Sequence, residues 1–146
     1  MTPPQVIYKD EHFLILNKPA GLIVHGDHPS LVDWLIRNFP EVKKVGDQPT
    51  ERPGIVHRLD KETSGVIAIA RDQEAFNYLK ALFQSHQVKK SYLALVYGVP
   101  KEKAGVIKKP LGIGRGSLKR TVHTTKARLI KEAITHYRVQ KTLLIK

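Results

Sequence analysis

Residues 52–70 read RPGIVHRLDKETSGVIAIA, and the rest of the chain is organised around this stretch. Its first part, residues 52–65, predicts a loop, because Pro53 and Gly54 favour a turn and the apolar pair that follows is too short for a full strand. Its last part, residues 66–70, is a continuous apolar run that predicts a strand buried on both faces. The loop therefore lies between two short apolar segments, a common setting for catalytic groups.

Ionisable side chains in this loop suggest its chemistry; they are His57, Arg58, Asp60 and Lys61. An aspartate has an ordinary pKa near ~4, and an arginine two residues away favours its ionised form even where water is largely excluded. An ionised carboxylate in a dry site is a nucleophile. The alternative is a surface Arg-Asp pair worth under about 1 kcal/mol, or an acidic run that caps a turn. Spacing alone leaves both interpretations open.

The segment HRLDKETSG, residues 57–65, resembles the central motif of the RluA-type pseudouridine synthases, which convert uridine in structured RNA into its C-glycoside isomer. The similarity runs nearly from end to end. Further segments that fall where this family has its motifs are NKPAGL at 17–22, KSYLALVYG at 90–98, IKKPLG at 107–112 and AITHY at 133–137. The resemblance implies an α+β fold with a mixed, largely antiparallel β-sheet and flanking helices.

The resemblance also implies catalytic roles for three residues. Asp60 would be the nucleophile or base that frees the uracil from its sugar. Arg58 would hold Asp60 ionised or fill the space that the flipped base leaves. Tyr92 would stack on the uracil and relay the proton lost from C5, although a tyrosine at the start of a predicted strand is otherwise assigned to the core. No metal or organic cofactor is expected for this isomerisation.

The chain is strongly basic, with 25 Lys and Arg against 13 Asp and Glu and a formal net charge of +12. This surplus favours nucleic acid as a partner, and the resemblance points to rRNA or tRNA; a merely soluble basic protein is the alternative. Within residues 101–131 the only acidic residue is Glu102, and LGIGRGSLKR at 111–120 predicts a basic hairpin tip or loop. The residues expected to contact RNA are His57, Lys18, Arg115, Lys119 and Arg120.

Several protein classes are excluded by composition. Without cysteine the chain has no disulfide, no thiolate nucleophile and no sulfur-ligated zinc, and its seven scattered histidines predict no metal site. No apolar run approaches the ~20 residues that span a bilayer, and the N-terminus does not resemble a signal peptide, so we expect a cytoplasmic protein with no membrane partner. Residues 1–146 are expected to form one catalytic domain with no auxiliary RNA-binding domain.

Local patterns predict the remaining elements. Strands are expected at 6–8 and 13–16, and a helix is expected from Ser30, with Asp33 in a capping box, to Pro40. Residues 41–52 are expected to form a surface connection. Asp72 can cap a second helix, whose predicted apolar positions are Phe76, Leu79, Leu82 and Phe83. Alternation predicts a strand at 89–97, and further strands are expected at 126–129 and 135–139.

The chain departs from the family pattern at its end. A later motif containing arginine and histidine, which the resemblance places beyond Tyr137, does not occur before Lys146. We therefore expect the N-terminal part of a catalytic domain without activity of its own, able to self-associate through an unpaired strand edge beside residues 143–145. One alternative is a catalytically incomplete RNA-binding fragment. Another is a kinase-like catalytic loop, which the inserted Leu59 and the lack of a preceding glycine-rich loop argue against.

Overall fold

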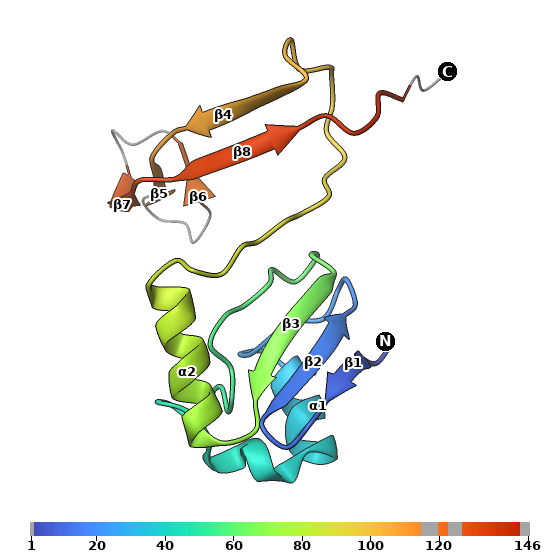
Figure 1. The fold of residues 1–146 in the computed structure, drawn as a ribbon, viewed down its shortest axis with the longest axis vertical. Helices are drawn as coiled ribbons and strands as arrows, with labels where there is room; N and C mark the ends of the chain where they lie inside the picture. Colours follow the sequence, from blue (N-terminus) through green and yellow to red (C-terminus); the bar gives the residue numbers. More distant parts are fainter. Residues whose placement is uncertain (1, 115–119, 123–126, 144–146) are drawn as a thin grey trace. The chain divides into compact units, whose positions relative to one another are not determined.

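The structure is a computed structural model that describes residues 2–114, 120–122 and 127–143. It divides the chain into two compact units, Met1–Ser91 and Tyr92–Lys146 (Figure 1). Each unit has a sheet structure of its own. No helix within the described ranges is long and apolar enough to cross a membrane.

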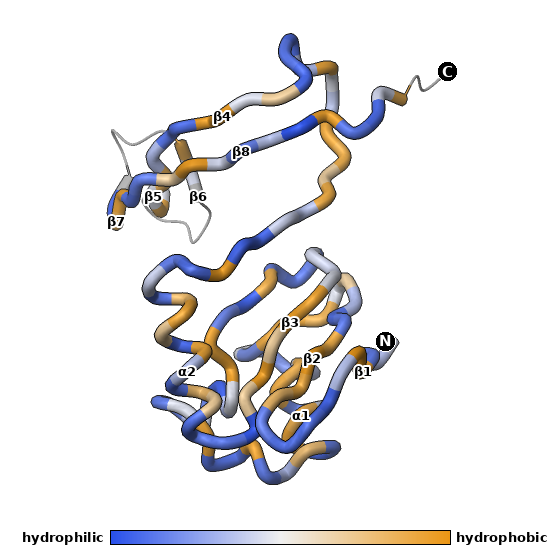
Figure 2. The backbone as a smooth tube through the Cα atoms, viewed as in Figure 1, coloured by the Kyte–Doolittle hydropathy of each residue, from blue (hydrophilic) through white to orange (hydrophobic). Residues whose placement is uncertain are grey.

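The first unit is built on a three-stranded antiparallel sheet in the order β1-β2-β3, with β1 at Gln5–Lys9, β2 at Phe13–Lys18 and β3 at Gly65–Ala70. Hydrophobic residues run along much of β2 and β3 (Figure 2). Side chains alternate between the two faces of a strand, and those that meet in the core are Leu14, Leu16, Ile67 and Ile69. The predicted strands at 6–8, 13–16 and 66–70 are confirmed.

Burial of β3 on both faces, as expected from its apolar run, is wrong. The side chain of Val66 is 60% exposed, whereas Ile67 and Ile69 are fully buried. The apolar side chains of α1, at Leu31–Asn38, join the core on the face that carries Ile67 and Ile69. An antiparallel sheet can leave its second face open to water, so an apolar run need not be buried throughout.

Both predicted helix starts are confirmed. Before α1, the Ser30 hydroxyl accepts a hydrogen bond of 3.2 Å from the Asp33 N–H, and the Asp33 carboxylate accepts one of 2.8 Å from the Ser30 N–H. Before α2, at Gln73–Gln84, the Asp72 carboxylate accepts a bond of 2.8 Å from the Ala75 N–H. These caps satisfy backbone donors that have no partner within the helix.

The connection between α1 and the central loop is more buried than the predicted surface segment. It begins with a 3-10 helix, η1, at Pro40–Lys44, which buries Val42 in the main core. Val45 joins a smaller core with Phe76 of α2. Single valines within a charged stretch do not reveal their burial through a periodic pattern, which is why the sequence suggested only a surface segment.

The second unit contains short antiparallel strands. β4 at Ala104–Lys108 pairs with β8 at Ile134–Arg138, while β5 at Leu111–Gly114 lies between β6 at Arg120–Thr121 and β7 at Ala127–Lys131. The two last predicted strands are thus confirmed within a few residues. Pairing of β5 with β6 also confirms a hairpin in the glycine-rich segment, whose tip at 115–119 lies outside the described residues.

Residues 89–97, predicted as a strand, form none in the structure. Leu93 is 90% exposed, and no described strand pairs with this segment. Alternation and β-propensity do not create a strand unless a neighbour supplies the backbone hydrogen bonds. Residues 139–143 likewise form no strand, so the expected edge beside Leu143 is absent from the described part of the chain; residues 144–146 lie outside it. Self-association stays a prediction.

Candidate active site

The central loop, residues 57–63, leaves the outer edge of the first sheet and returns to it at the start of β3. From His57 to Asp60 its side chains alternate between the interior and the solvent. His57 is half-buried and Leu59 is 7% exposed, whereas Arg58 and Asp60 are exposed. The buried positions hold the loop to the core, so the guanidinium and the carboxylate are presented to solvent from a fixed backbone.

Lys18, the last residue of β2, anchors the far end of this loop. Its buried ammonium donates hydrogen bonds to the carbonyl oxygens of Pro19 at 3.0 Å, Leu22 at 2.7 Å and Lys61 at 3.1 Å. The N–H of Gly21 donates a further bond of 2.9 Å to the Lys61 carbonyl. Burial lowers the pKa of Lys18, and the charges of Glu62 and Asp60 partly oppose this effect. The NKPAGL and HRLD segments are thereby joined.

An RNA contact by Lys18 does not fit this geometry. The side chain has no exposed surface, and its three ammonium hydrogens are all directed at backbone carbonyls. A phosphate would have to replace these partners in the interior. The signal for burial was present in the alternation of β2, because Leu14, Leu16 and Lys18 point to the same face.

His57 anchors the near end of the loop. Its Nε2 accepts a hydrogen bond of 3.0 Å from the Ala68 N–H in β3, and its ring stacks on Phe83 of α2 with centroids 4.5 Å apart and planes at 15°. Burial lowers the pKa of His57 to about 4, and the charge of Lys90 acts in the same direction. The imidazole is therefore neutral at neutral pH with its proton on Nδ1.

Arg58 and Asp60 occupy the outward positions of the loop. No ion pair joins these two described side chains, and both are exposed. The two side chains are therefore not paired in this unit, and stabilisation of the ionised carboxylate by Arg58 stays a prediction. The turn that follows is closed by the Thr63 N–H, which donates a bond of 3.1 Å to the Asp60 carbonyl.

The other expected site residues belong to the second unit. Tyr92 is its first residue and is 65% exposed. Arg120 begins β6, while Arg115 and Lys119 lie outside the described residues. The first unit thus brings together the His57, Arg58 and Asp60 positions with Lys18, and Tyr92 belongs to the other unit.

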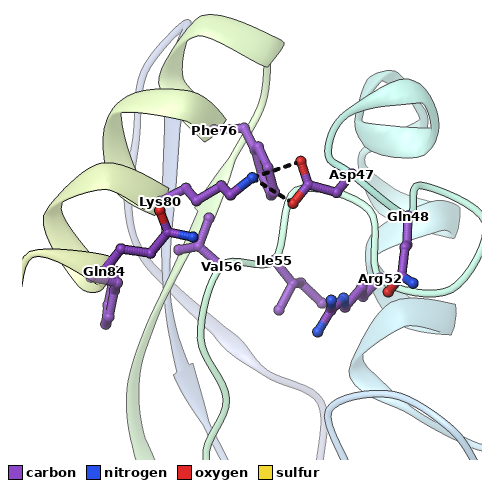
Figure 3. Close-up of a pocket in the computed structure, with 9 residues that line it drawn as sticks. Asp47, Gln48, Arg52, Ile55, Val56, Phe76, Lys80 and Gln84 are labelled. Atoms are coloured by element: carbon purple, nitrogen blue, oxygen red, sulfur yellow. Dashed lines mark hydrogen bonds and ion pairs between the residues drawn. The ribbon is translucent and has the colours of Figure 1, made fainter.

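A pocket of about 320 Å³, which no pattern in the sequence had indicated, lies beside the start of the loop. Ile55 and Val56 line it, and Lys80 is paired with Asp47 across it at 2.8 Å (Figure 3). Phe83 contributes to the wall and is also the stacking partner of His57. Within the ranges described, no group of three or more His, Asp or Glu side chains is arranged to hold a metal.

Comparison with known proteins identifies the family. A family model described as RNA pseudouridylate synthase matches residues 12–143. The chain belongs to this family. The match includes both segments joined by Lys18 and continues through the second unit, in agreement with the RluA-type resemblance.

Individual pseudouridine synthases are similar over almost the whole chain. An uncharacterized RNA pseudouridine synthase of Synechocystis is 36% identical over 141 residues, which cover 94% of this chain and 42% of that protein. The ribosomal large subunit pseudouridine synthase D of Nitrosomonas europaea is 38% identical over 144 residues, which cover 94% of this chain and 38% of that protein. The chain spans less than half the length of these curated relatives.

A solved structure supports the fold. Human RNA Pseudouridylate Synthase Domain Containing 4 has a TM-score of 0.72 and 29% sequence identity to this chain, covering 95% of this chain and 54% of its own. Together with the antiparallel sheets and two α-helices described above, this likeness confirms the expected α+β fold of a pseudouridine synthase.

Proposed function

We propose that this chain carries the aspartate-bearing part of a synthase that isomerises uridine to pseudouridine in structured RNA. The presentation of Asp60 is the observation that carries the proposal. This exposed residue lies between the buried Leu59 and Lys61, whose carbonyl accepts hydrogen bonds from Lys18 and Gly21. Membership of the RNA pseudouridylate synthase family supports the same chemistry.

In the proposed reaction, the target nucleotide first turns out of its stack, at a cost of a few kcal/mol. The bond between C1′ and N1 of uracil breaks, the base turns, and C1′ bonds to C5. The hydrogen on C5 leaves as a proton and N1 gains one, so the product is an isomer of the substrate. Asp60 acts as the nucleophile or base that allows the first bond to break.

The proposal gives supporting roles to two further residues. Arg58, an exposed residue two positions before Asp60, fills the space that the flipped base leaves in the RNA or stabilises the ionised carboxylate. Tyr92 stacks on the uracil and relays the proton from C5. An aromatic ring suits the first task because stacking on a base contributes about 1–3 kcal/mol.

The proposed substrate is rRNA or tRNA in the cytoplasm. The net charge of +12 favours a polyanion, and the name of the Nitrosomonas relative refers to the large ribosomal subunit. Basic residues expected to contact the phosphate backbone are Arg115, Lys119 and Arg120. Such contacts would position the RNA without selecting a particular uridine.

Replacement of Asp60 in the intact protein tests this function. With RNA carrying tritium at C5 of uridine, Asp60→Asn should reduce tritium release at least about 10³-fold, because the carboxylate is lost, while RNA affinity stays within about twofold. Glu62→Gln removes another carboxylate of the same loop and is expected to retain activity. Turnover by Asp60→Asn at a rate near that of Glu62→Gln would show that Asp60 is not the reacting group.

A further inference from the structure

At the point where the central loop leaves the outer edge of β3, a side chain accepts the hydrogen bond of a strand N–H group. The Ala70 N–H donates a hydrogen bond of 2.9 Å to the Gly54 carbonyl, and Ile69 forms an antiparallel bridge with Ile55. At the next outward position, Ala68 donates its N–H to the imidazole of His57 rather than to a backbone carbonyl. The chain therefore runs beside β3 as far as residue 55, and the His57 side chain supplies the final hydrogen bond.

We propose that His57 is a positioning residue whose imidazole, held between the Ala68 N–H and the Phe83 ring, determines where the loop leaves the sheet and hence where Asp60 lies. This inference rests on the proposed function and deepens it. It replaces the expected RNA contact with a role inside the protein.

Spacing along the loop connects His57 to the carboxylate. His57 and the carbonyl of Lys61 are attached to the body of the first unit by hydrogen bonds, and Leu59 between them is held by its burial. Asp60 lies between the last two of these attachments and three residues from the first. With a few residues between attachments, release of one end changes the backbone direction along the loop, and a displacement of ~1 Å at a reacting group can lower a rate about 10²-fold.

The chemical form of the imidazole suits this task. A neutral ring with the proton on Nδ1 leaves Nε2 free to accept from a backbone N–H, whereas a protonated ring has no acceptor. The elements that pack on the ring, β3 at Ala68 and α2 at Phe83, bring no charge to these contacts. Lys90 is the charged group whose field acts on His57, and it favours the neutral form.

Three variants of the intact protein separate positioning from RNA binding and from general stability. His57→Leu removes the acceptor, and His57→Gln retains an oxygen that can accept from Ala68. His25→Leu replaces another half-buried histidine, outside the loop, and serves as the matched control. Tritium release at saturating RNA is measured well below the unfolding temperature, and rates are expressed per folded molecule.

We expect His57→Leu to lower kcat about 10- to 100-fold with KM and RNA affinity within about threefold, because substrate binding is retained while the carboxylate is misplaced. His57→Gln should restore kcat to within about threefold of the unaltered protein, and His25→Leu should have no effect. An unchanged kcat in His57→Leu would overturn the proposal. So would a raised KM at constant kcat, because that result identifies an RNA contact.

Nuclear magnetic resonance tests the same proposal without turnover. The ring nitrogens of His57 should report a proton on Nδ1, and His57→Leu should shift the backbone amide signals of Arg58 and Asp60, with partial recovery in His57→Gln. A proton on Nε2, or unshifted amides, contradicts the positioning role. If the unaltered protein releases no tritium, the proposed function fails, and these signals still decide whether His57 positions the loop.

Discussion

The carbonyl oxygen of Lys61 accepts a 3.1 Å hydrogen bond from the buried ammonium of Lys18, 43 positions earlier in the chain. Lys61 directly follows Asp60, so the proposed catalytic carboxylate is attached through its neighbour to the end of β2. The same ammonium also binds the carbonyls of Pro19 and Leu22. One side chain thus shapes the NKPAGL turn and the central loop together.

Loss of this ammonium should destabilise the first unit. Lys18→Met keeps much of the apolar stem but removes the ammonium donor from three carbonyl oxygens, of which that of Lys61 keeps its bond from the Gly21 N–H. Each buried unsatisfied group costs about 1–3 kcal/mol, and water can reach some of them, so we expect the free energy of unfolding to fall by about 3 kcal/mol in urea titrations. Lys89→Met, at an exposed lysine, should change it by less than about 0.5 kcal/mol. Equal effects of the two variants would contradict the role assigned to Lys18.

Gly54 should tolerate no side chain. Its φ is +68°, and an added Cβ would lie 2.3 Å from the Ala70 carbonyl oxygen, which belongs to the backbone and has little room to move. We expect Gly54→Ala to lower the free energy of unfolding by about 3 kcal/mol or more. Gly26→Ala is the control, because Gly26 has a φ of +104° but no atom within 4 Å of an added Cβ, so only backbone strain of about 1–2 kcal/mol applies. Similar decreases in the free energy of unfolding in both variants would mean that the backbone moves to remove the close contact with the Ala70 carbonyl oxygen.

The neutral His57 predicts a specific pH dependence of stability. Its pKa is about 4 in the folded protein and near ~6.5 in an unfolded chain, so between these values the unfolded state binds more protons. The contribution of neutral His57 to the free energy of unfolding is fully present above about pH 6.5 and is lost as the pH falls towards 4. The unaltered protein and His57→Leu differ in their free energy of unfolding. After allowance for the partial exposure of His57, we expect this difference to shift against the unaltered protein by on the order of 2 kcal/mol as the pH falls across this range.

Two other histidines, His12 and His28, change the stability with pH in the opposite direction to His57. Their contributions must cancel when the two proteins are compared. Hydrogen bonding to Asp72 raises the pKa of His12, and hydrogen bonding to Asp33 raises that of His28. Their stabilising contribution is present below the unfolded pKa and is lost as the pH rises. Both residues are the same in the two proteins, so the difference in urea unfolding isolates His57. A difference that stays constant from pH 7 to 4 would contradict its low pKa.

The basic surplus predicts a salt-dependent affinity for RNA. If about five phosphates are contacted, the slope of log affinity against log salt should be near −4, because each contact contributes about −0.7 to −0.9. Replacing Lys119 and Arg120 with alanine should flatten the slope by about 1.5 and leave the chosen uridine unchanged. Fluorescence anisotropy over a range of salt concentrations provides the measurement. A slope near zero would rule out the basic surface as an RNA-binding site.

Features that depend on a few neighbouring residues were predictable from the sequence. The capping box of Ser30 and Asp33 spans three positions, and Asp72 caps α2 over the same distance. The HRLDKETSG motif likewise indicated the family and the position of Asp60 on a loop. Such signals are local because the side chains involved meet within one turn of the backbone.

Contacts between distant segments were decided by the tertiary structure. Lys18 of the NKPAGL segment and His57 of the HRLDKETSG segment were expected to contact RNA. In the structure Lys18 bonds to a carbonyl 43 positions away and His57 to a backbone N–H eleven positions away. Residues 89–97 have the alternation of a strand but no partner among the described strands. The sequence alone determined which groups the chain carries and which short elements begin where. Burial and pairing depend on which distant segment lies opposite, and only the folded chain specifies that.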